Sequence, residues 1–288
     1  MISTEYTLPW IEHDVLLDLI RSHFGKAMQK VQVDRTNLST DPTLNILRSF
    51  ALNLTEAEIE NAEQVVAITK TLQNAIGDFH QDVLGNVPGW RSMGRTDGVY
   101  DIESLKPVTL AGDKHVIAEV KMRYNTIKGS EKKNIWQDLE KQVRSRGKAG
   151  TLALLIEIIP QRKVAYDRPW KVSRTEPVEY VRHVDGVTGY YYVTGHPTAL
   201  HDLFLTLPSL LIEAFPRESD YVRSAEDIAR FVEGLCASAL PALPFGYDPK
   251  ILGHSSALEL RQSTPQEVRL LRSEKSVQPS RSLPVTFL

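Results

Sequence analysis

Residues 151–160 of this sequence read TLALLIEIIP, a run in which nearly every side chain is apolar. A strand with one face in water alternates apolar and polar residues, so this run instead predicts a strand that is covered on both faces. Such strands are typical of α/β proteins, in which helices pack on each side of the sheet. We therefore expect an α/β fold built around this strand.

Periodicity and turn residues predict the elements on either side of that strand. Thr55 followed by Glu58 is the pattern of a capping box, and Gly85 is the expected end of the helix that begins there. The expected elements are helix 11–31, a polar linker over 33–42, helix 55–85, a turn over 85–90, strands 98–104 and 115–122, helix 131–146, strand 151–160, a hairpin over 176–195 turning at Asp185-Gly186, and helices 197–215 and 224–240. This order predicts a mixed sheet flanked by helices.

Three regions are expected along the chain. Residues 1–53 form an N-terminal helical region, 54–196 the α/β core, and 197–288 a set of C-terminal helices. From about Gly246 the sequence is richer in Ser, Pro and Arg, which predicts an extended arm or a partly mobile tail. The region after residue 197 is a candidate for dimer or DNA contacts.

Composition excludes several classes of protein. The 288 residues contain no apolar stretch near the roughly 18 residues that span a bilayer, and the N-terminus has no secretory pattern. Cys236 is the only cysteine, so no internal disulfide can form, and the eight histidines show no zinc-binding spacing. No phosphate-binding loop of the nucleotide hydrolases is present. A cytoplasmic protein with no membrane partner is expected.

Charge is distributed unevenly along the chain. Residues 121–182 hold 15 Lys and Arg against 7 Asp and Glu, while the rest holds 19 against 29. A basic segment in an otherwise acidic protein is a candidate binding surface for a polyanion, although such runs are more often solvated faces.

Three charged residues lie where two expected strands meet. Glu119 and Lys121 are two positions apart, so they share one face of their strand, and Asp101 lies on the preceding strand. If the strands pair, both carboxylates converge on one point, and a divalent cation relieves their repulsion. Oxygen ligands suit Mg²⁺, and the Val120 carbonyl can add another oxygen. Lys121 is then placed to contact the attacking water and a scissile phosphate.

This pattern resembles the PD-(D/E)XK nuclease superfamily. The residues that carry the resemblance are Asp101, then the Glu119-Val120-Lys121 triplet, then a helix and an apolar strand. The ordered segments FHQ, GW, YDI, EVK, YNT and LLIEIIP, over roughly residues 74–160, further resemble a family of type II restriction endonucleases that cut GGNCC. The resemblance implies a PD-(D/E)XK core, an α-β-β-β-α-β unit with a mixed sheet.

The same resemblance implies an activity and roles for individual residues. It implies Mg²⁺-dependent cleavage of double-stranded DNA, with Asp101 and Glu119 as metal ligands and Lys121 as the positioning cation. Tyr100 stands where the superfamily pattern has Pro. Asp97 in GRTDG is the alternative metal ligand, and Asp101 is preferred because it is expected inside the strand, whereas Asp97 resembles a turn residue.

Residues after the catalytic strand are candidates for DNA contact. Asn125 and Thr126 match the family motif and are expected at a phosphate or base edge, with a plain turn as the alternative. The basic side chains in this region that we assign to DNA binding are Arg123, Lys128, Arg144 and Arg146. For Arg144 and Arg146, a role at the end of their helix is equally expected. Base-reading arginines are expected among the exposed basic residues near the apolar strand, which are Arg162, Lys163, Arg168, Lys171 and Arg174.

Other residues near the core have weaker assignments. Glu60 or Glu63 is a candidate for an additional metal carboxylate, but a solvated helix face is favoured. His80 and Gln81 are candidates for approach to DNA or to the active site, with a helix-end role as the alternative. Trp136 and Trp170 are expected to be packing residues rather than base-stacking platforms.

The sequence therefore predicts a Mg²⁺-dependent type II restriction endonuclease that acts on double-stranded DNA. A palindromic site is matched by a two-fold homodimer, and the region after residue 197 is the expected interface. Two alternatives remain open: a repair or recombination nuclease on the same core, and a catalytically inactive DNA-binding module.

Overall fold

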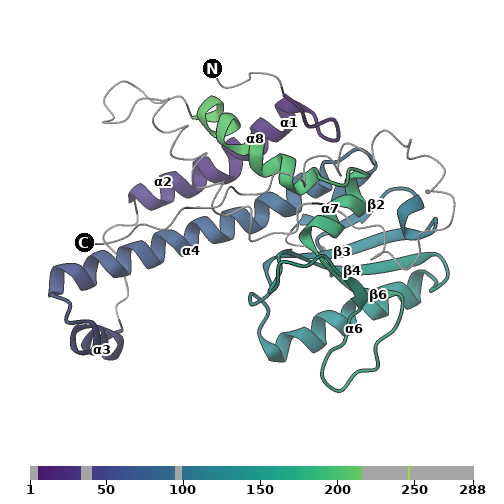
Figure 1. The fold of residues 1–288 in the computed structure, drawn as a ribbon. Helices are drawn as coiled ribbons and strands as arrows, with labels where there is room; N and C mark the ends of the chain where they lie inside the picture. Colours follow the sequence, from purple (N-terminus) through teal and green to yellow (C-terminus); the bar gives the residue numbers. More distant parts are fainter. Residues whose placement is uncertain (1–5, 34–40, 95–98, 216–245, 247–288) are drawn as a thin grey trace, which may run out of the picture. The chain divides into compact units, whose positions relative to one another are not determined.

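A computed structural model describes residues 6–33, 41–94, 99–215 and 246, all within one compact unit, Met1–Gly253. The helices are α1 (His13–Ile20), a π-helical turn (Arg21–Gly25), α2 (Lys26–Val33), α3 (Pro42–Leu52), α4 (Glu56–Gly85), a 3₁₀ turn (Thr109–Ala111), α6 (Gly129–Arg146), α7 (Gly186–Thr194) and α8 (Ala199–Ala214). The strands are β1 (Trp90–Ser92), β2 (Ile102–Ser104), β3 (His115–Arg123), β4 (Thr151–Ile159), β5 (Asp167–Pro169) and β6 (Val181–Asp185). Figure 1 shows their arrangement.

The strands described form one mixed sheet in the order β1-β2-β3-β4-β6-β5. Strands β1, β2 and β3 pair antiparallel, β3, β4 and β6 pair parallel, and β5 is antiparallel to β6. The sequence of elements from α4 to β4 is the predicted α-β-β-β-α-β unit. The predicted fold class is confirmed.

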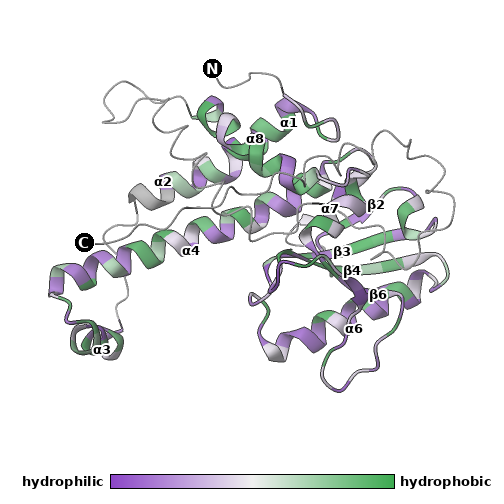
Figure 2. Ribbon diagram, viewed as in Figure 1, coloured by the Kyte–Doolittle hydropathy of each residue, from purple (hydrophilic) through white to green (hydrophobic). Residues whose placement is uncertain are grey.

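Strand β4 lies in the middle of this sheet and is covered on both faces, as its composition predicts. Leu152, Leu154 and Ile156 pack into a core cluster with residues of α1, α4, α7 and α8. Ala153 and Leu155 point the other way and pack with α6. Figure 2 shows the apolar colour of β3 and β4 between these helices. Alternation of side chains along the strand thus divides one apolar run between two cores.

The helix α4 begins and ends as predicted. The backbone N–H of Thr55 donates to Glu58 Oε2 at 2.8 Å, and the N–H of Glu58 donates to Thr55 Oγ1 at 3.4 Å. This reciprocal pair is the capping box expected from the sequence. The 30-residue helix ends at Gly85, against the backbone of Ser92 in β1.

The predicted hairpin over residues 176–195 is wrong. Strand β6 ends at Asp185, and the next nine residues form the helix α7. Asp185 caps this helix, since its Oδ1 accepts hydrogen bonds from the backbone N–H groups of Val187 at 2.9 Å and Thr188 at 3.3 Å. Tyr190 and Tyr192 are fully buried, so packing outweighs the strand preference of this tyrosine-rich segment.

Other boundaries also differ from the expectations. The predicted strand 98–104 is regular only over Ile102–Ser104, while Trp90, placed in a turn, begins β1. Helix α3 and the short strand β5 were not predicted. The predicted helix 11–31 is confirmed, with the π-helical turn inside it. The predicted helix 224–240, the arm from residue 247 onward and Cys236 lie outside the described residues.

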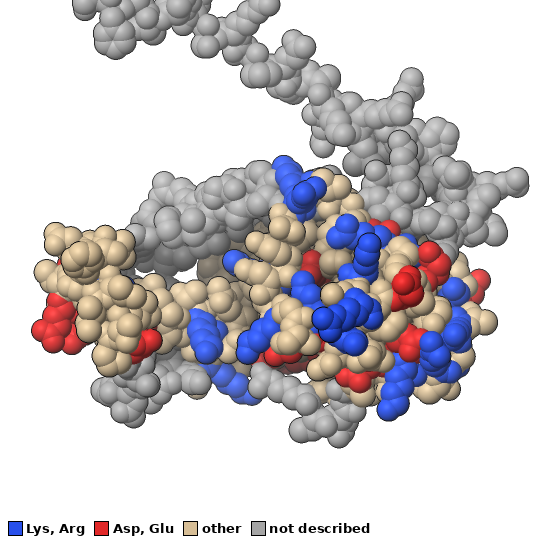
Figure 3. Space-filling model, turned by 90° about the horizontal axis from the view of Figure 1, so that it is seen from below, with Lys and Arg blue, Asp and Glu red and all other residues tan. Residues whose placement is uncertain are grey.

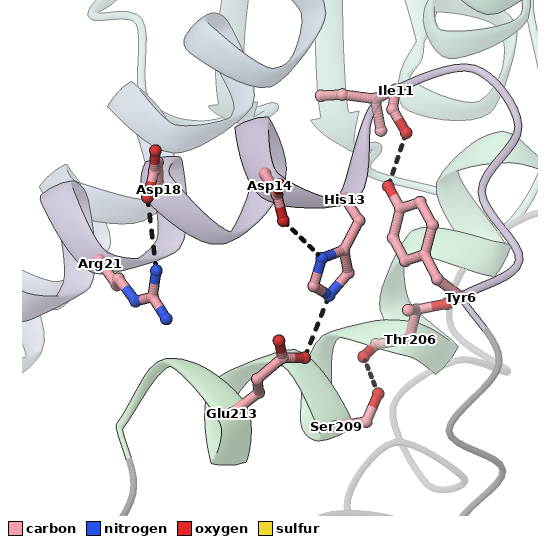
Figure 4. A network of polar contacts seen from close by, with 9 residues as sticks. All are labelled: Tyr6, Ile11, His13, Asp14, Asp18, Arg21, Thr206, Ser209 and Glu213. Atoms are coloured by element: carbon pink, nitrogen blue, oxygen red, sulfur yellow. Dashed lines mark hydrogen bonds and ion pairs between the residues drawn. The ribbon is translucent and has the colours of Figure 1, made fainter.

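The N-terminal helix α1 and the helix α8 pack in the same core cluster as the sheet. His13 joins them, because its Nε2 lies 3.1 Å from Glu213 Oε2 and its Nδ1 lies 3.1 Å from Asp14 Oδ1 (Figure 4). Hydrogen bonds to these two carboxylates raise the pKa of His13. Tyr6 anchors the chain before α1, since its hydroxyl donates to the Ile11 carbonyl at 2.7 Å. The division into three regions at residues 53 and 196 stays a prediction.

No described helix is both long and apolar enough to cross a bilayer.

Candidate active site

Asp101 and Glu119 are brought together by two hydrogen bonds between the chain before β2 and strand β3. The backbone N–H of Asp101 donates to the Ala118 carbonyl at 2.9 Å. Its side-chain Oδ2 accepts from the backbone N–H of Val120 at 2.7 Å. Asp101 thus binds β3 on both sides of Glu119. Because the side chain takes up a backbone donor of β3, regular pairing of β2 begins only at Ile102.

Lys121 completes this group. Its Nζ lies 2.5 Å from Glu119 Oε1, and the two side chains are 26% and 12% exposed. Both residues lie on β3, two positions apart, so the strand's alternation places them on one face. The predicted convergence of Asp101, Glu119 and Lys121 is therefore observed, while their catalytic roles stay predictions. Asp97, the alternative metal ligand, lies outside the described residues.

The three charges act strongly on one another. Burial, with a smaller contribution from the charge of Glu119, raises the pKa of Asp101 to about 7, although Lys121 opposes both effects. Burial lowers the pKa of Lys121, but the charges of Glu119 and Asp101 outweigh it, so the pKa of the ammonium group is raised overall. A partly buried acid pair with one cation is an arrangement that a further positive charge stabilises.

The oxygen atoms at this point fit a magnesium ion. Within the described ranges, no three His, Cys, Asp or Glu side chains are grouped closely enough to hold a metal by themselves. Two carboxylates are nevertheless adjacent, and the Val120 carbonyl belongs to the residue that follows Glu119. Gln81 Nε2 lies 3.4 Å from that carbonyl oxygen, which shows that the oxygen points towards α4. Mg²⁺ keeps several waters and needs few protein ligands, so two acids and a carbonyl are a suitable set.

Helix α4 brings a further acid to the site, but not one of those considered from the sequence. The charge of Asp78 raises the pKa of Asp101. Asp78, Gln81 and Asp101 line one cavity of about 520 Å³, together with Ser22, His23, Lys26 and Ala27 of the N-terminal helices. Glu63 instead lies 3.5 Å from Arg48 of α3. The sequence did contain a reason to consider Asp78 as a site residue. It precedes Gln81 by three positions, so the two side chains share one face of α4.

His80 and Gln81 have different surroundings. They are consecutive residues of α4, so their side chains point in directions about 100° apart around the helix. Gln81 approaches the site at Val120. His80 is fully buried on the other side of α4, where its Nδ1 lies 2.7 Å from the hydroxyl of Tyr190. Burial lowers the pKa of His80 to about 4. His80 is therefore a packing residue in the described structure.

The segment after β3 forms a tight turn that exposes the predicted DNA contacts. Thr126 Oγ1 donates to the Arg123 carbonyl at 2.7 Å, and its backbone N–H donates to the same oxygen at 3.1 Å. Arg123, Asn125, Thr126 and Lys128 are all exposed. The turn directly follows the strand that carries Glu119 and Lys121. These four side chains stay predicted DNA contacts, now placed beside the candidate active site.

Arg144 and Arg146, by contrast, have partners within the protein. Arg144 pairs with Glu140 one helical turn earlier. Arg146 Nη1 lies 2.9 Å from Glu103 Oε2, and the guanidinium also donates a hydrogen bond to the hydroxyl of Tyr100 and lies over its ring. Glu103 is only 4% exposed, so Arg146 neutralises a buried acid of β2. Arg146 thus contributes to the packing of α6 against the sheet, whereas Arg144 forms an exposed pair within α6, and DNA contact by both stays a prediction.

The loop after β4 carries exposed basic residues near the same edge of the sheet. Arg123 pairs with Ile159 at the ends of β3 and β4, so the loop that follows β4 begins next to the turn that follows β3. The predicted base-reading candidates in and after this loop, Arg162, Lys163, Arg168, Lys171 and Arg174, are all exposed. Figure 3 shows Lys and Arg gathered over the part of the molecule that contains the sheet and α6. Trp136 and Trp170 are buried, as expected of packing residues.

Glu157 is a buried acid that the sequence interpretation did not explain. It is the one charged residue of β4, and it stands beside Lys121 in the parallel register of β3 and β4. Its Oε2 accepts from the hydroxyl of Tyr166 at 2.8 Å and lies 3.0 Å from His183 Nε2. Burial raises the pKa of Glu157, but His183 and Tyr166 outweigh this and lower it overall. The sequence did contain a reason to examine Glu157, because it is a single carboxylate in an otherwise apolar strand.

Comparisons with known proteins agree with this geometry. The family model described as Eco47II restriction endonuclease matches residues 8–215, more than half of the chain. The chain is 34% identical over 160 residues to the type II restriction enzyme Eco47II of Escherichia coli, which covers 52% of this chain and 63% of that enzyme. It is 23% identical over 124 residues to the type II restriction enzyme Sau96I of Staphylococcus aureus, covering 43% and 44%. The matched regions thus span less than two thirds of either enzyme.

Proposed function

Because the chain belongs to the Eco47II restriction endonuclease family, we propose that it is a Mg²⁺-dependent type II restriction endonuclease that cuts both strands of double-stranded DNA at a specific site. The observation that carries this proposal is the convergence of Asp101, Glu119 and Lys121 at the end of β3. The basic turn after β3 and the neighbouring basic loop after β4 supply the surface for the polyanion.

The proposed reaction is hydrolysis of one phosphodiester bond in each strand. A water oxygen forms a new bond to phosphorus while the bond from phosphorus to the 3′ oxygen breaks in line, which leaves a 5′-phosphate and a 3′-hydroxyl. When bound, Mg²⁺ supplies Lewis-acid stabilisation of the phosphate charge and lowers the pKa of a coordinated water.

The residues of this chain have distinct tasks in that reaction. Asp101 and Glu119 would hold the metal, and the Val120 carbonyl would supply a further oxygen ligand. Lys121 donates hydrogen bonds to the attacking water and to a non-bridging phosphate oxygen, where negative charge develops. Gln81 and Asp78 position the site from α4, because Gln81 contacts the Val120 carbonyl and Asp78 acts on Asp101.

Site recognition is proposed for GGNCC, in line with the resemblance of residues 74–160 to enzymes that cut this sequence. Guanines dominate this site, and bidentate arginine is their usual reader in the major groove. Exposed arginines of the loop after β4 are the proposed readers, because this loop begins beside the active site. A homodimer places one active site at each strand of such a two-fold sequence.

The reducing cytoplasm is the proposed compartment, since a single cysteine permits no internal disulfide.

One experiment tests activity and specificity together. The purified protein is incubated with a sequenced plasmid and Mg²⁺, and the ends of the products are determined by run-off sequencing. We expect discrete fragments whose ends all lie within GGNCC, none when the metal is chelated with EDTA, and none with Lys121→Met. Discrete fragments with ends in another sequence reject the proposed site but retain the enzyme class. Nicking without discrete fragments, or cleavage of branched DNA alone, contradicts the proposed class.

A further inference from the structure

Helix α3 and the first part of α4 expose large apolar side chains to solvent. Phe50 is 90% exposed, Ile46 69% and Leu52 65%. The other exposed apolar residues of this surface, which we call the α3–α4 patch, are Leu44, Leu47, Val65 and Val66. Figure 2 shows the apolar colour that recurs along α3 and α4. Large exposed apolar side chains gathered at one end of a molecule often mark an interaction site.

Helix α3 has no core of its own. None of its residues is buried, and it is 11 residues long. Isolated helices of that length are only marginally stable in water, so most of their stability comes from packing of an apolar face. Within the described structure, α3 is attached to α4 by few interactions, of which the Arg48–Glu63 pair at 3.5 Å is the charge contact. Within the described residues, the apolar side chains of α3 therefore lack a cover.

The charges around the patch disfavour a nucleic acid or a membrane surface as that cover. Arg48 is the only charged residue of α3, and it is paired with Glu63. The first two turns of α4 are acidic, with Glu56, Glu58 and Glu60. In Figure 3 this end of the molecule is tan and red, whereas Lys and Arg gather elsewhere. DNA and anionic lipid bind basic surfaces, so an apolar protein surface is the fitting occupant.

We propose that the α3–α4 patch binds the same patch of a second copy of this chain, forming a two-fold dimer. An uncharged apolar surface is complementary to itself, as an isologous interface requires. The seven side chains expose an area on the order of 700 Å² per copy, near the roughly 800 Å² per partner of a standard interface. The choice of a second copy rests on the proposed function, because a chain with one catalytic centre needs a partner to cut two strands.

This location differs from the interface expected after residue 197. Helix α8 buries Leu200, Leu203 and Leu210 in the core of its own chain, so these residues are not available to a partner. Residues 216–245 and 247–288 lie outside the described structure, and an interface there stays a prediction. Helix α4, in turn, carries Val65 of the patch and Gln81 of the candidate active site on one continuous helix, about 24 Å apart along its axis. Docking of two patches thus sets the separation of the two catalytic centres through a pair of rigid helices.

The test compares the mass of the full chain in solution with that of patch variants, without DNA and without metal. Size-exclusion chromatography with light scattering is run from 1 to 50 µM protein on the natural chain, on Ile46→Asp/Phe50→Asp, and on Leu205→Asp. Leu205 is an exposed apolar residue of α8, 55% exposed, outside the patch. We expect twice the chain mass of 32.4 kDa for the natural chain and for Leu205→Asp, and a single chain mass for the double variant.

Folding of the variants is checked by circular dichroism and thermal unfolding. If the double variant is unfolded, Val65→Asp/Val66→Asp on α4 replaces it, because α4 is anchored in the core at its other end. A natural chain that is monomeric at 50 µM overturns the proposal, as does a folded patch variant that remains a dimer. This test contains no DNA, so its result does not depend on nuclease activity. A protein that dimerises through the patch but does not cut DNA would support this interface and contradict the proposed function.

Discussion

The carboxylate of Asp101 accepts a 2.7 Å hydrogen bond from the backbone N–H of Val120, and so it is held against the strand that carries Glu119 and Lys121. This bond places one acid next to another across two segments of the chain. It also orients Asp101 before any ligand binds, which the proposed role as a metal ligand requires.

Asp101→Asn tests which aspartate serves the metal. Loss of one carboxylate removes a ligand and its charge, so we expect plasmid cleavage to fall by at least about 1,000-fold. The free energy of unfolding should be unchanged or increased, because burial already disfavours the charged form of Asp101. The measurements are cleavage rate and urea denaturation. Asp97→Asn is the matched control and should cut normally; an inactive Asp97→Asn with an active Asp101→Asn would exchange the two assignments.

Substitution of Arg146 and of Lys128 is expected to distinguish a cation that stabilises the fold from one that binds DNA. Arg146→Ala removes a partner of the buried Glu103 and should lower the free energy of unfolding by about 1 kcal/mol. Lys128→Ala should leave stability unchanged and should reduce the slope of log affinity against log salt by about one, as for one lost phosphate contact. Denaturation and DNA binding at several salt concentrations are measured for both. A reduced salt slope for Arg146→Ala alone would reverse these roles.

Gly186→Ala should destabilise the protein strongly. A Cβ at this position would lie 2.4 Å from the Ile158 carbonyl oxygen and 2.7 Å from the Ile158 Cα, both backbone atoms of β4. Since neither atom can move without distorting the central strand, we expect a loss of about 3 kcal/mol. Gly77→Ala in α4 is the opposite case, because no atom lies within 4 Å and a helix interior favours alanine by about 1 kcal/mol. Thermal unfolding of the two variants should therefore shift in opposite directions.

His80 should make the protein less stable as the pH falls below neutrality. Its pKa is lowered to about 4 in the folded protein, while an unfolded histidine has its ordinary pKa near 6.5. Below about pH 6.5 the unfolded chain therefore binds a proton that the folded chain excludes, and the loss levels off near pH 4. We expect His80 to contribute a loss of about 2 kcal/mol between pH 7 and pH 5.

Urea denaturation of the natural chain and of His80→Gln at both pH values isolates this effect. The other histidines are present in both proteins, including His13, whose raised pKa acts in the opposite direction. The difference between the two proteins should shrink by about 2 kcal/mol at pH 5. An unchanged difference would mean that His80 accepts a proton in the folded state.

The sequence alone determined the features that depend on local pattern. The uninterrupted apolar run of β4 required helices on both faces, Thr55 and Glu58 specified the start of α4, and the spacing of Glu119 and Lys121 placed both on one face of β3. Each of these follows from the period of a strand or helix over a few residues, so one sequence was sufficient.

How distant segments of the chain meet depends on the packing of the whole fold. The segment 190–194 is helical because Tyr190 and Tyr192 are buried in the core, and this burial outweighs the local strand preference. Asp78 and Glu63 look alike in sequence, yet Asp78 acts on Asp101 while Glu63 pairs with Arg48. Arg146 similarly acquired a structural partner in Glu103, 43 residues earlier in the numbering. Such contacts depend on how α4 and α6 pack against the sheet. Local periodicity does not reveal which charged side chains this packing brings together.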